Sequence, residues 1–240
     1  MSTTEQTAGP IIICVVNQKG GCCKTATSMQ LSGTLQKVGF SVFVADMDPQ
    51  NTASLWSLQA DPETPFPATV LSLAPLREAF LDKLVSAAKN YQFIIIDCPP
   101  AVESPVPWAA LMAADLAIIP VIPLMDNVWA SKQMEEMILR ARTTRRDRGI
   151  SGELHAGYLL SQVRRGNVFE SCEAALRKQA QLPLFQTRIA LRNVYPESQV
   201  FGTTVHSLGK SPAVAEFDAL GKEVLDMLGI KMPKHRGNRK

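Results

Sequence analysis

Residues 15–25 read Val15-Val16-Asn17-Gln18-Lys19-Gly20-Gly21-Cys22-Cys23-Lys24-Thr25, and the rest of the chain is arranged around them. An apolar run from Ile11 to Cys14 precedes them and has the pattern of a buried strand. A segment with helical periodicity follows, from Thr25 to Val38. In this context, backbone N–H groups at a helix N-terminus converge on phosphate oxygens. The segment therefore predicts a phosphate-binding loop.

The residue types in the loop fit this interpretation. Gly20 and Gly21 leave room for close approach to a phosphate, Lys24 is placed to reach the β- and γ-phosphates, and the Thr25 hydroxyl is placed to bind Mg²⁺. The ordinary pattern G-x-x-x-x-G-K-[ST] fails, because Gln18 and Cys23 stand where its glycines belong. The alternative is a Gly-Gly turn with surface lysines, and the flanking strand and helix favour the phosphate loop over it.

Two acidic segments follow apolar strands further along the chain. The run Ser41 to Ala45 leads into Asp46-Met47-Asp48-Pro49-Gln50, and the run Phe93 to Ile96 ends in Asp97. Ligands bind at the carboxyl ends of strands in parallel α/β sheets, so these acids are candidates for the Mg²⁺ site. A turn that caps the helix Thr52 to Leu58 is an equally good interpretation of the first segment taken alone.

The loop K-G-G-x-x-K-[ST], with Lys19 before the glycine pair, resembles the deviant Walker A motif of the ParA/MinD family of ATPases. The D-x-D-P-Q segment at Asp46 resembles that family's switch region, and Asp97 followed by Cys98-Pro99-Pro100 resembles its D-x-P-P continuation. The resemblance extends from Ile11 to Leu228. It is closest to small ParA-type plasmid partition proteins that lack an N-terminal helix-turn-helix domain.

The resemblance implies ATP and Mg²⁺ as cofactors and assigns a role to each site residue. Lys19 crosses to the nucleotide of a partner subunit, Lys24 acts within its own subunit, and Asp48 orients or activates the attacking water. The expected catalytic residues are Lys19, Lys24 and Asp48; the expected nucleotide contacts are Lys19, Gly20, Gly21, Cys22, Cys23, Lys24, Thr25 and Ala26; the expected Mg²⁺ site comprises Thr25, Asp46 and Asp97. The adenine-contacting segment is expected near the end of the strand His155 to Gln162.

The same resemblance implies a slow ATPase that a partner protein stimulates. ATP closes a homodimer, the dimer binds nonspecific DNA, and a ParB-type centromere-binding protein or cargo adaptor links it to its cargo. The cargo is expected to be a plasmid or chromosome region, and the location cytoplasmic and nucleoid-associated. Two alternatives stay open: a protein cargo such as a carboxysome or chemoreceptor cluster, or, because of Cys23, a nucleotide-gated DNA-binding switch with little hydrolysis.

Length and patterning predict the fold class. The chain has 240 residues, 46% of them hydrophobic and 20% charged, as in an ordinary globular protein. Buried-strand patterns alternate with helices, which predicts a single-domain α/β fold with a mostly parallel, twisted sheet and helices on both faces. Expected segments are a flexible tail over 1–9, the ATPase domain over 10–230 and a basic tail over 231–240.

The net charge and the lengths of the apolar runs limit the classes of partner that the chain is expected to bind. Net charge is +3, so binding to nucleic acid must come from local clusters. The helix expected near 127–148 ends in one such cluster, either a solvated helix end or a DNA contact: Arg140, Arg142, Arg145, Arg146 and Arg148. No membrane partner is expected, because the apolar runs are too short to span a bilayer and the C-terminal tail lacks an apolar face. The five cysteines lack the paired spacing that iron–sulfur relatives need.

Overall fold

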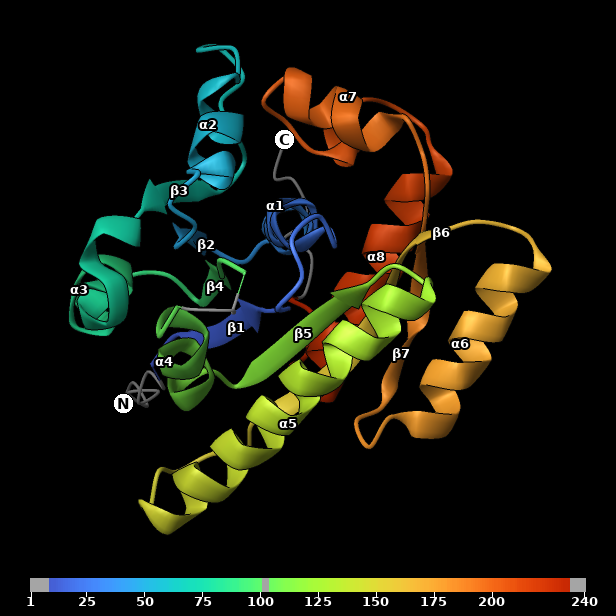
Figure 1. Ribbon diagram of the computed structural model, residues 1–240. Coiled ribbons are helices and arrows are strands. Elements are labelled where there is room, and N and C mark those ends of the chain that lie inside the picture. The colour runs from blue at the N-terminus through green and yellow to red at the C-terminus, as the bar shows by residue number, and fades with distance from the viewer. Residues whose placement is uncertain (1–8, 101–103, 234–240) are drawn as a thin grey trace.

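The computed structural model describes residues 9–100 and 104–233 and has the predicted α/β architecture (Figure 1). Seven parallel strands form one sheet in the order β3-β2-β4-β1-β5-β6-β7. The strands are β1 (Ile11–Val15), β2 (Val42–Asp46), β3 (Thr69–Ser72), β4 (Phe93–Asp97), β5 (Leu116–Val121), β6 (His155–Val163) and β7 (Leu184–Ala190). Because β1 lies between β4 and β5, the chain changes direction along the sheet there, and ligands bind at such points in parallel sheets.

Helices connect the strands and cover both faces of the sheet (Figure 1). The helices are α1 (Lys24–Lys37), α2 (Thr52–Leu58), α3 (Phe80–Ala88), α4 (Val106–Ala113), α5 (Met125–Asp147), α6 (Asn167–Gln179), α7 (Val194–Val200) and α8 (Pro212–Met227). Two 3-10 helices, η1 (Ala74–Ala79) and η2 (Val205–Ser207), complete the described elements.

Each face of the sheet has its own hydrophobic core. In β4, Ile94 and Ile96 pack with α3 to α6, whereas Phe93 and Ile95 pack with α1, α2 and α8. Side chains of a strand alternate between faces, so a strand buried on both sides is apolar throughout. This burial explains the continuous Ile and Val runs, and it fixes the register in which Asp46 and Asp97 end adjacent strands.

The sequence predicted most α-helices and strands within a few residues and missed four of them. β3 is an edge strand of four residues with exposed and half-buried positions in alternation, so it has no apolar run. α4, β7 and α7 were not predicted as elements either. The helix expected from Leu76 to Lys89 was wrong in its first turn, because Arg77 has a φ of 48° and a ψ of −132° and separates η1 from α3. Within the described residues, no helix is long and apolar enough to cross a membrane.

Candidate functional site

The predicted loop joins β1 to α1 at the carboxyl edge of the sheet, beside the point where the strand order reverses. Asn17 anchors its start: the Nδ2 donates to Pro120 O at 2.8 Å, and the Oδ1 accepts from Lys19 N at 3.2 Å. Gly21 and Cys23 both have positive φ, 73° and 72°, so the chain turns twice before α1 begins. This conformation suits glycine and is uncommon for other residues, so the loop holds Cys23 in a strained backbone conformation.

Lys24 is directed back over the loop. Its side chain is buried, and Nζ donates to Lys19 O at 2.9 Å. The ammonium group therefore lies within the turn whose backbone N–H groups are expected to surround a phosphate. A buried cation at the positive end of a helix requires an anion, and a phosphate group supplies one.

Lys19 forms an ion pair with Asp126 in the first turn of α5, and both groups are partly exposed. The hydrogen bond from Lys19 lowers the pKa of the Asp126 carboxyl below its usual range. Lys19 is therefore not directed at the phosphates of its own loop. This position is compatible with the predicted role on a partner subunit, provided that the ion pair opens.

Asp97 ends β4 below the first turn of α1. Its Oδ1 accepts from Ser28 Oγ at 2.9 Å, whereas the fully buried Oδ2 has no protein partner among the described residues. Burial raises the pKa of this carboxyl to about 7, opposed by the nearby Thr25 and Ser28 hydroxyls. An unpartnered buried carboxylate oxygen close to Thr25 fits a bound Mg²⁺ and its water shell.

Asp46 and Asp48 lie at the end of β2 in different environments. Asp46 is buried, and Oδ2 accepts from Ser54 N at 2.8 Å and from Ser54 Oγ at 2.9 Å. Burial raises its pKa, and the bonds from Ser54 oppose that change. Asp48 is half-buried, and Oδ1 accepts from Gln50 N at 2.9 Å in a turn. The turn considered in the sequence is therefore present, and it leaves Asp48 accessible at the carboxyl edge.

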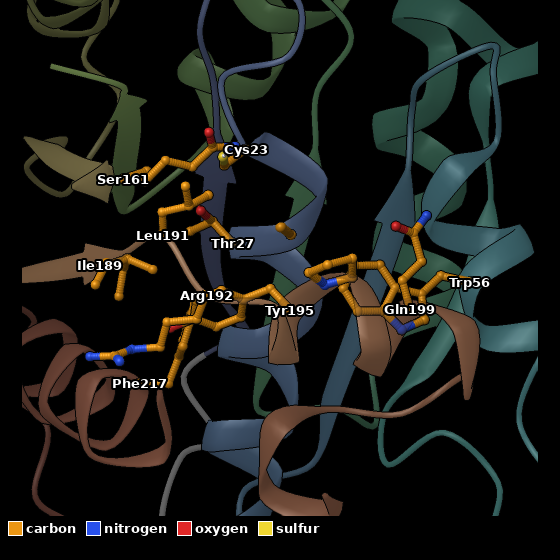
Figure 2. Close-up of a pocket in the computed structure, with 14 residues that line it drawn as sticks. Cys23, Thr27, Trp56, Ser161, Ile189, Leu191, Arg192, Tyr195, Gln199 and Phe217 are labelled. Atoms are coloured by element: carbon orange, nitrogen blue, oxygen red, sulfur yellow. Dashed lines mark hydrogen bonds between the residues drawn. The ribbon is translucent and has the colours of Figure 1, made fainter. Parts of the chain in front are cut away.

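A pocket of about 190 Å³ opens on the other side of the loop (Figure 2). Its walls come from the start of α1, the end of β6, the segment after β7, and α2, α7 and α8. Lining residues include Cys23, Ala26, Thr27, Trp56, Ser161, Gln162, Leu191 and Tyr195. Gln162 also has a positive φ, 51°, and Nε2 lies 3.1 Å from Cys23 Sγ. Two strained residues thus meet where the loop borders the pocket.

Glu216 of α8 fixes the far wall of this pocket. Its Oε1 accepts from Arg192 Nε at 3.0 Å, and its Oε2 accepts from Tyr195 Oη at 2.7 Å. The Arg192 guanidinium turns away from the other labelled residues, while the Tyr195 ring lies among them (Figure 2). The wall is therefore apolar and aromatic, because the Arg192 guanidinium forms an ion pair with Glu216.

The two loop thiols are not activated nucleophiles. Burial raises the pKa of Cys22, and it raises the pKa of Cys23 to about 11. Cys22 Sγ contacts Lys19 O at 3.1 Å. Both groups remain protonated at neutral pH, and Cys23 enters the site as a small side chain that limits the space at the loop.

The arginine cluster of α5 is divided between structural and surface roles. Arg145 is buried and donates to the carbonyl oxygens of Leu111 and Ala114, so both interpretations of the cluster were wrong for this residue. Arg142 Nε donates to Leu154 O at 2.9 Å, and Arg140 stacks on Trp108. Arg146 and Arg148 are exposed and form no ion pair within the described residues.

The structure adds residues that the motifs alone did not identify. Ser28, Asp126, Gln162 and Tyr195 each contact a predicted site residue or line the pocket. Only the end of β6 was expected near the base, and it does border the pocket. The remaining residues come from α5, α7 and the second turn of α1, where no spacing rule relates them to the loop.

The fold and the loop define this chain as a P-loop nucleotide-binding protein of the doubly wound α/β class. It belongs to the family described as "CobQ/CobB/MinD/ParA nucleotide binding domain", whose pattern matches residues 13–205. The resemblance to ParA/MinD proteins is thereby confirmed.

Named relatives lie within this family. The chain is 30% identical over 201 residues to the "Maintenance of carboxysome distribution protein A" of Halothiobacillus neapolitanus, covering 82% of this chain and 87% of the relative. It is 28% identical over 265 residues to the "Chromosome partitioning protein ParA" of Myxococcus xanthus, covering 94% and 91%. Among solved structures, cobyrinic acid a,c-diamide synthase from Mycobacterium smegmatis, with bound ATP analog and magnesium, has the same fold. Its TM-score is 0.72 at 20% identity, covering 95% of this chain and 99% of that one.

Proposed function

We propose that this protein is a ParA-type ATPase that dimerises on ATP and positions a cargo over nonspecific DNA. One observation carries the proposal: the same first turn of α1 borders the buried Lys24, the unpartnered Asp97 Oδ2 and the base-sized pocket. A nucleotide needs these three features in this order, for its phosphates, its metal and its base. The ATPase domain would span residues 10–230, between short tails over 1–9 and 231–240.

ATP would bind with its phosphates in the loop and its adenine in the pocket beside Cys23 and Gln162. The apolar walls at Ala26 and Leu191 suit a planar base, and the Gln162 amide supplies both a donor and an acceptor. The backbone N–H groups from Gly20 to Ala26 would contact the phosphates, with Lys24 countering their charge. This assigns the base contacts to the segments after β6 and β7.

Mg²⁺ would be held by the Thr25 hydroxyl and by the Asp97 carboxylate, with Asp46 in the surrounding shell. When bound, the ion neutralises phosphate charge and polarises the γ-phosphoryl group. Ser28 orients Asp97 Oδ1 and leaves Oδ2 free toward the site. Asp48, accessible at the same edge, would orient the attacking water. Turnover would be slow until a partner protein stimulates it.

A second copy would cover the carboxyl edge of the sheet and bring its Lys19 to the nucleotide. Exposed apolar side chains follow three neighbouring strands at this edge: Leu124 and Trp129 after β5, Val168 after β6 and Leu191 after β7. The carboxyl ends of parallel strands meet at one edge, so these side chains share a face that association would bury. This distribution supports the ATP-dependent homodimer.

The cargo is proposed in two forms. A plasmid or chromosome region, reached through a ParB-type adaptor, is supported by the named chromosome-partitioning relative. A protein cargo is supported by the relative whose name refers to carboxysome distribution. With either cargo, the protein would bind DNA through exposed cations such as Arg146 and Arg148. Its location would then be the nucleoid in the cytoplasm.

Two variants test the nucleotide assignments. Lys24→Ala should reduce ATP affinity at least about a hundredfold, because the buried cation is the main countercharge of the loop. Asp48→Ala should keep ATP-dependent dimerisation and lose turnover. ATP binding, sedimentation and phosphate release measure the three properties. Unchanged ATP affinity in Lys24→Ala would refute the phosphate-loop assignment, and normal turnover in Asp48→Ala would remove Asp48 from the mechanism.

A further inference from the structure

Helices α2 and α7 form a joint surface. Trp56 Nε1 of α2 donates to Thr203 O at 3.0 Å, just beyond α7. Gly202 lies so close to Ala60 that an added Cβ would meet the Ala60 nitrogen at 1.9 Å. The two helices lie at the same end of the molecule, beside α1 (Figure 1). Their contact is therefore fixed by backbone packing that only glycine permits.

This α2/α7 surface carries four exposed apolar side chains. Leu58 is 76% exposed, Val200 69%, Phe201 61% and Leu55 55%. Leu58 lies two residues before Ala60, and Phe201 directly precedes Gly202, so each helix has an exposed apolar residue next to this backbone contact. Clustered apolar exposure of this kind marks an interaction site, whereas single exposed residues do not.

The two stretches of chain that form this surface carry charges of one sign. Residues 38–76 and 193–209 contain no Lys or Arg, although the chain has 25 of them. The exposed acids Asp61, Glu63 and Glu197 lie in these two stretches, and none forms an ion pair within the described part of the chain. The surface thus combines an apolar centre with uncompensated negative charge.

We propose that the α2/α7 surface binds a cationic segment of a partner protein, one that places apolar side chains among its Lys and Arg residues. The apolar anchors would cover Leu58 and Phe201, and the cations would pair with Glu63 and Glu197. Such an arrangement gives affinity through burial and selectivity through charge. What the partner does rests on the proposed function, whereas the binding itself rests on this surface alone.

The surface is connected to the nucleotide site through both helices. α2 begins just after the switch residues Asp46 and Asp48, and Tyr195 and Gln199 of α7 line the base pocket. Gln30 connects α1 to α7 and to η2. Its Nε2 donates to Ser198 Oγ at 2.7 Å, and its Oε1 accepts from Val205 N at 2.9 Å. A partner held here contacts the elements that a nucleotide would also contact.

The experiment measures binding of a fluorescein-labelled peptide of about 18 residues, with leucine on one helical face and lysine on the other. A matched peptide carries glutamate in place of lysine. The wild-type chain should bind the lysine peptide and not the glutamate peptide. Leu58→Ser/Phe201→Ser and Glu63→Lys/Glu197→Lys should each weaken binding at least about tenfold. The exposed pair Trp129→Ser/Val168→Ser is the matched control and should bind like the wild type.

Four outcomes would overturn the proposal: no binding by the wild type, equal binding by the surface variants, loss of ATP-dependent dimers in Leu58→Ser/Phe201→Ser, or binding only after truncation following Pro233. The third would assign the surface to a second copy, and the fourth to the chain's own basic tail. The variants of the α2/α7 surface should retain ATP affinity and basal turnover, which also verifies their folding. The control pair lies on the proposed dimer face, so its folding is verified by ATP affinity alone. If the lysine peptide does not bind but ATP-dependent dimerisation is normal, this proposal is wrong and the proposed function is unaffected.

Discussion

Cys23 shows how one residue defines the boundary of the site. It has the backbone conformation that glycine adopts most easily, and its side chain lines the pocket. Cysteine carries a single heavy atom on its Cβ, so the loop tolerates it. Sequence alone showed that a glycine was replaced, but the contact between Cys23 and Gln162 depends on β6, which lies two strands from β1 in the sheet.

A branched side chain at position 23 should fail where glycine succeeds. Cys23→Val places a β-branched residue at φ 72°, which should destabilise the fold by about 1–2 kcal/mol and weaken nucleotide binding. Cys23→Gly removes the steric cost and should retain ATP affinity. Thermal unfolding and ATP titration of both variants measure the effect. Equal behaviour of the valine variant and the wild type would show that the loop is not constrained at this position.

Asp97 should make the stability of the nucleotide-free protein depend on pH. Burial raises its pKa from 3.8 to about 7, so between these values the folded chain holds a proton that the unfolded chain has released. The free energy of unfolding therefore falls as pH rises through this window, and it levels off above about pH 7. A tenfold difference in proton affinity between the folded and unfolded chains corresponds to about 1.4 kcal/mol, so the total is on the order of a few kcal/mol.

Asp97→Asn should remove this part of the pH dependence. Urea unfolding at about pH 5 and about pH 8, without nucleotide, compares the variant with the wild type. The contribution of Asp46, whose pKa is also raised, remains in both proteins. The same loss of stability with pH in both would mean that Asp97 is not the group that titrates.

At the scale of the elements, the pair between Lys19 and Asp126 joins the phosphate loop to α5. Its side chains are 35% and 60% exposed, so it contributes little to folding stability. It competes, however, with the role of Lys19 on a partner subunit. Asp126→Asn should therefore leave the thermal midpoint unchanged and increase the dimer fraction several-fold at subsaturating ATP.

Sedimentation velocity with ATP, with ADP and without nucleotide measures that dimer fraction. Lys19→Ala is the matched variant, and it should remain monomeric in every state. A lower dimer fraction in Asp126→Asn would show that Asp126 supports the dimer and does not restrain Lys19.

Among the strands, the sequence predicted those inside the sheet and missed the two at its edges, β3 and β7. β1, β4 and β5 are apolar throughout because each is central, and their ends located Lys24 and Asp97. β3 is an exposed edge strand, and α7 is a short helix whose position depends on Gln30 and Gly202. Local patterning cannot specify such elements, since contacts distant in sequence hold them. Of the pocket beside the loop, only the wall at the end of β6 was expected from the sequence, for the same reason.

At the scale of the whole molecule, the exposed cations of α5 should contribute to DNA binding and the buried one to folding. Arg146→Glu/Arg148→Glu should weaken binding to random-sequence duplex and flatten its dependence on salt, because fewer phosphate contacts release fewer counterions. Arg145→Met is the contrasting variant: it leaves the carbonyl groups of Leu111 and Ala114 without a donor and should lower the thermal midpoint. Unchanged DNA affinity in the double variant would exclude this end of α5 as a contact.

The measurement that tests the central claim most directly is binding to random-sequence duplex DNA with ATP, with ADP and without nucleotide, at several salt concentrations. We expect tight binding with ATP alone, weakening steeply as salt rises, and its loss in both Lys19→Ala and Lys24→Ala. Binding of equal strength in all three nucleotide states, or no binding in any of them, would contradict the assignment of this protein as an ATP-switched, DNA-riding ATPase.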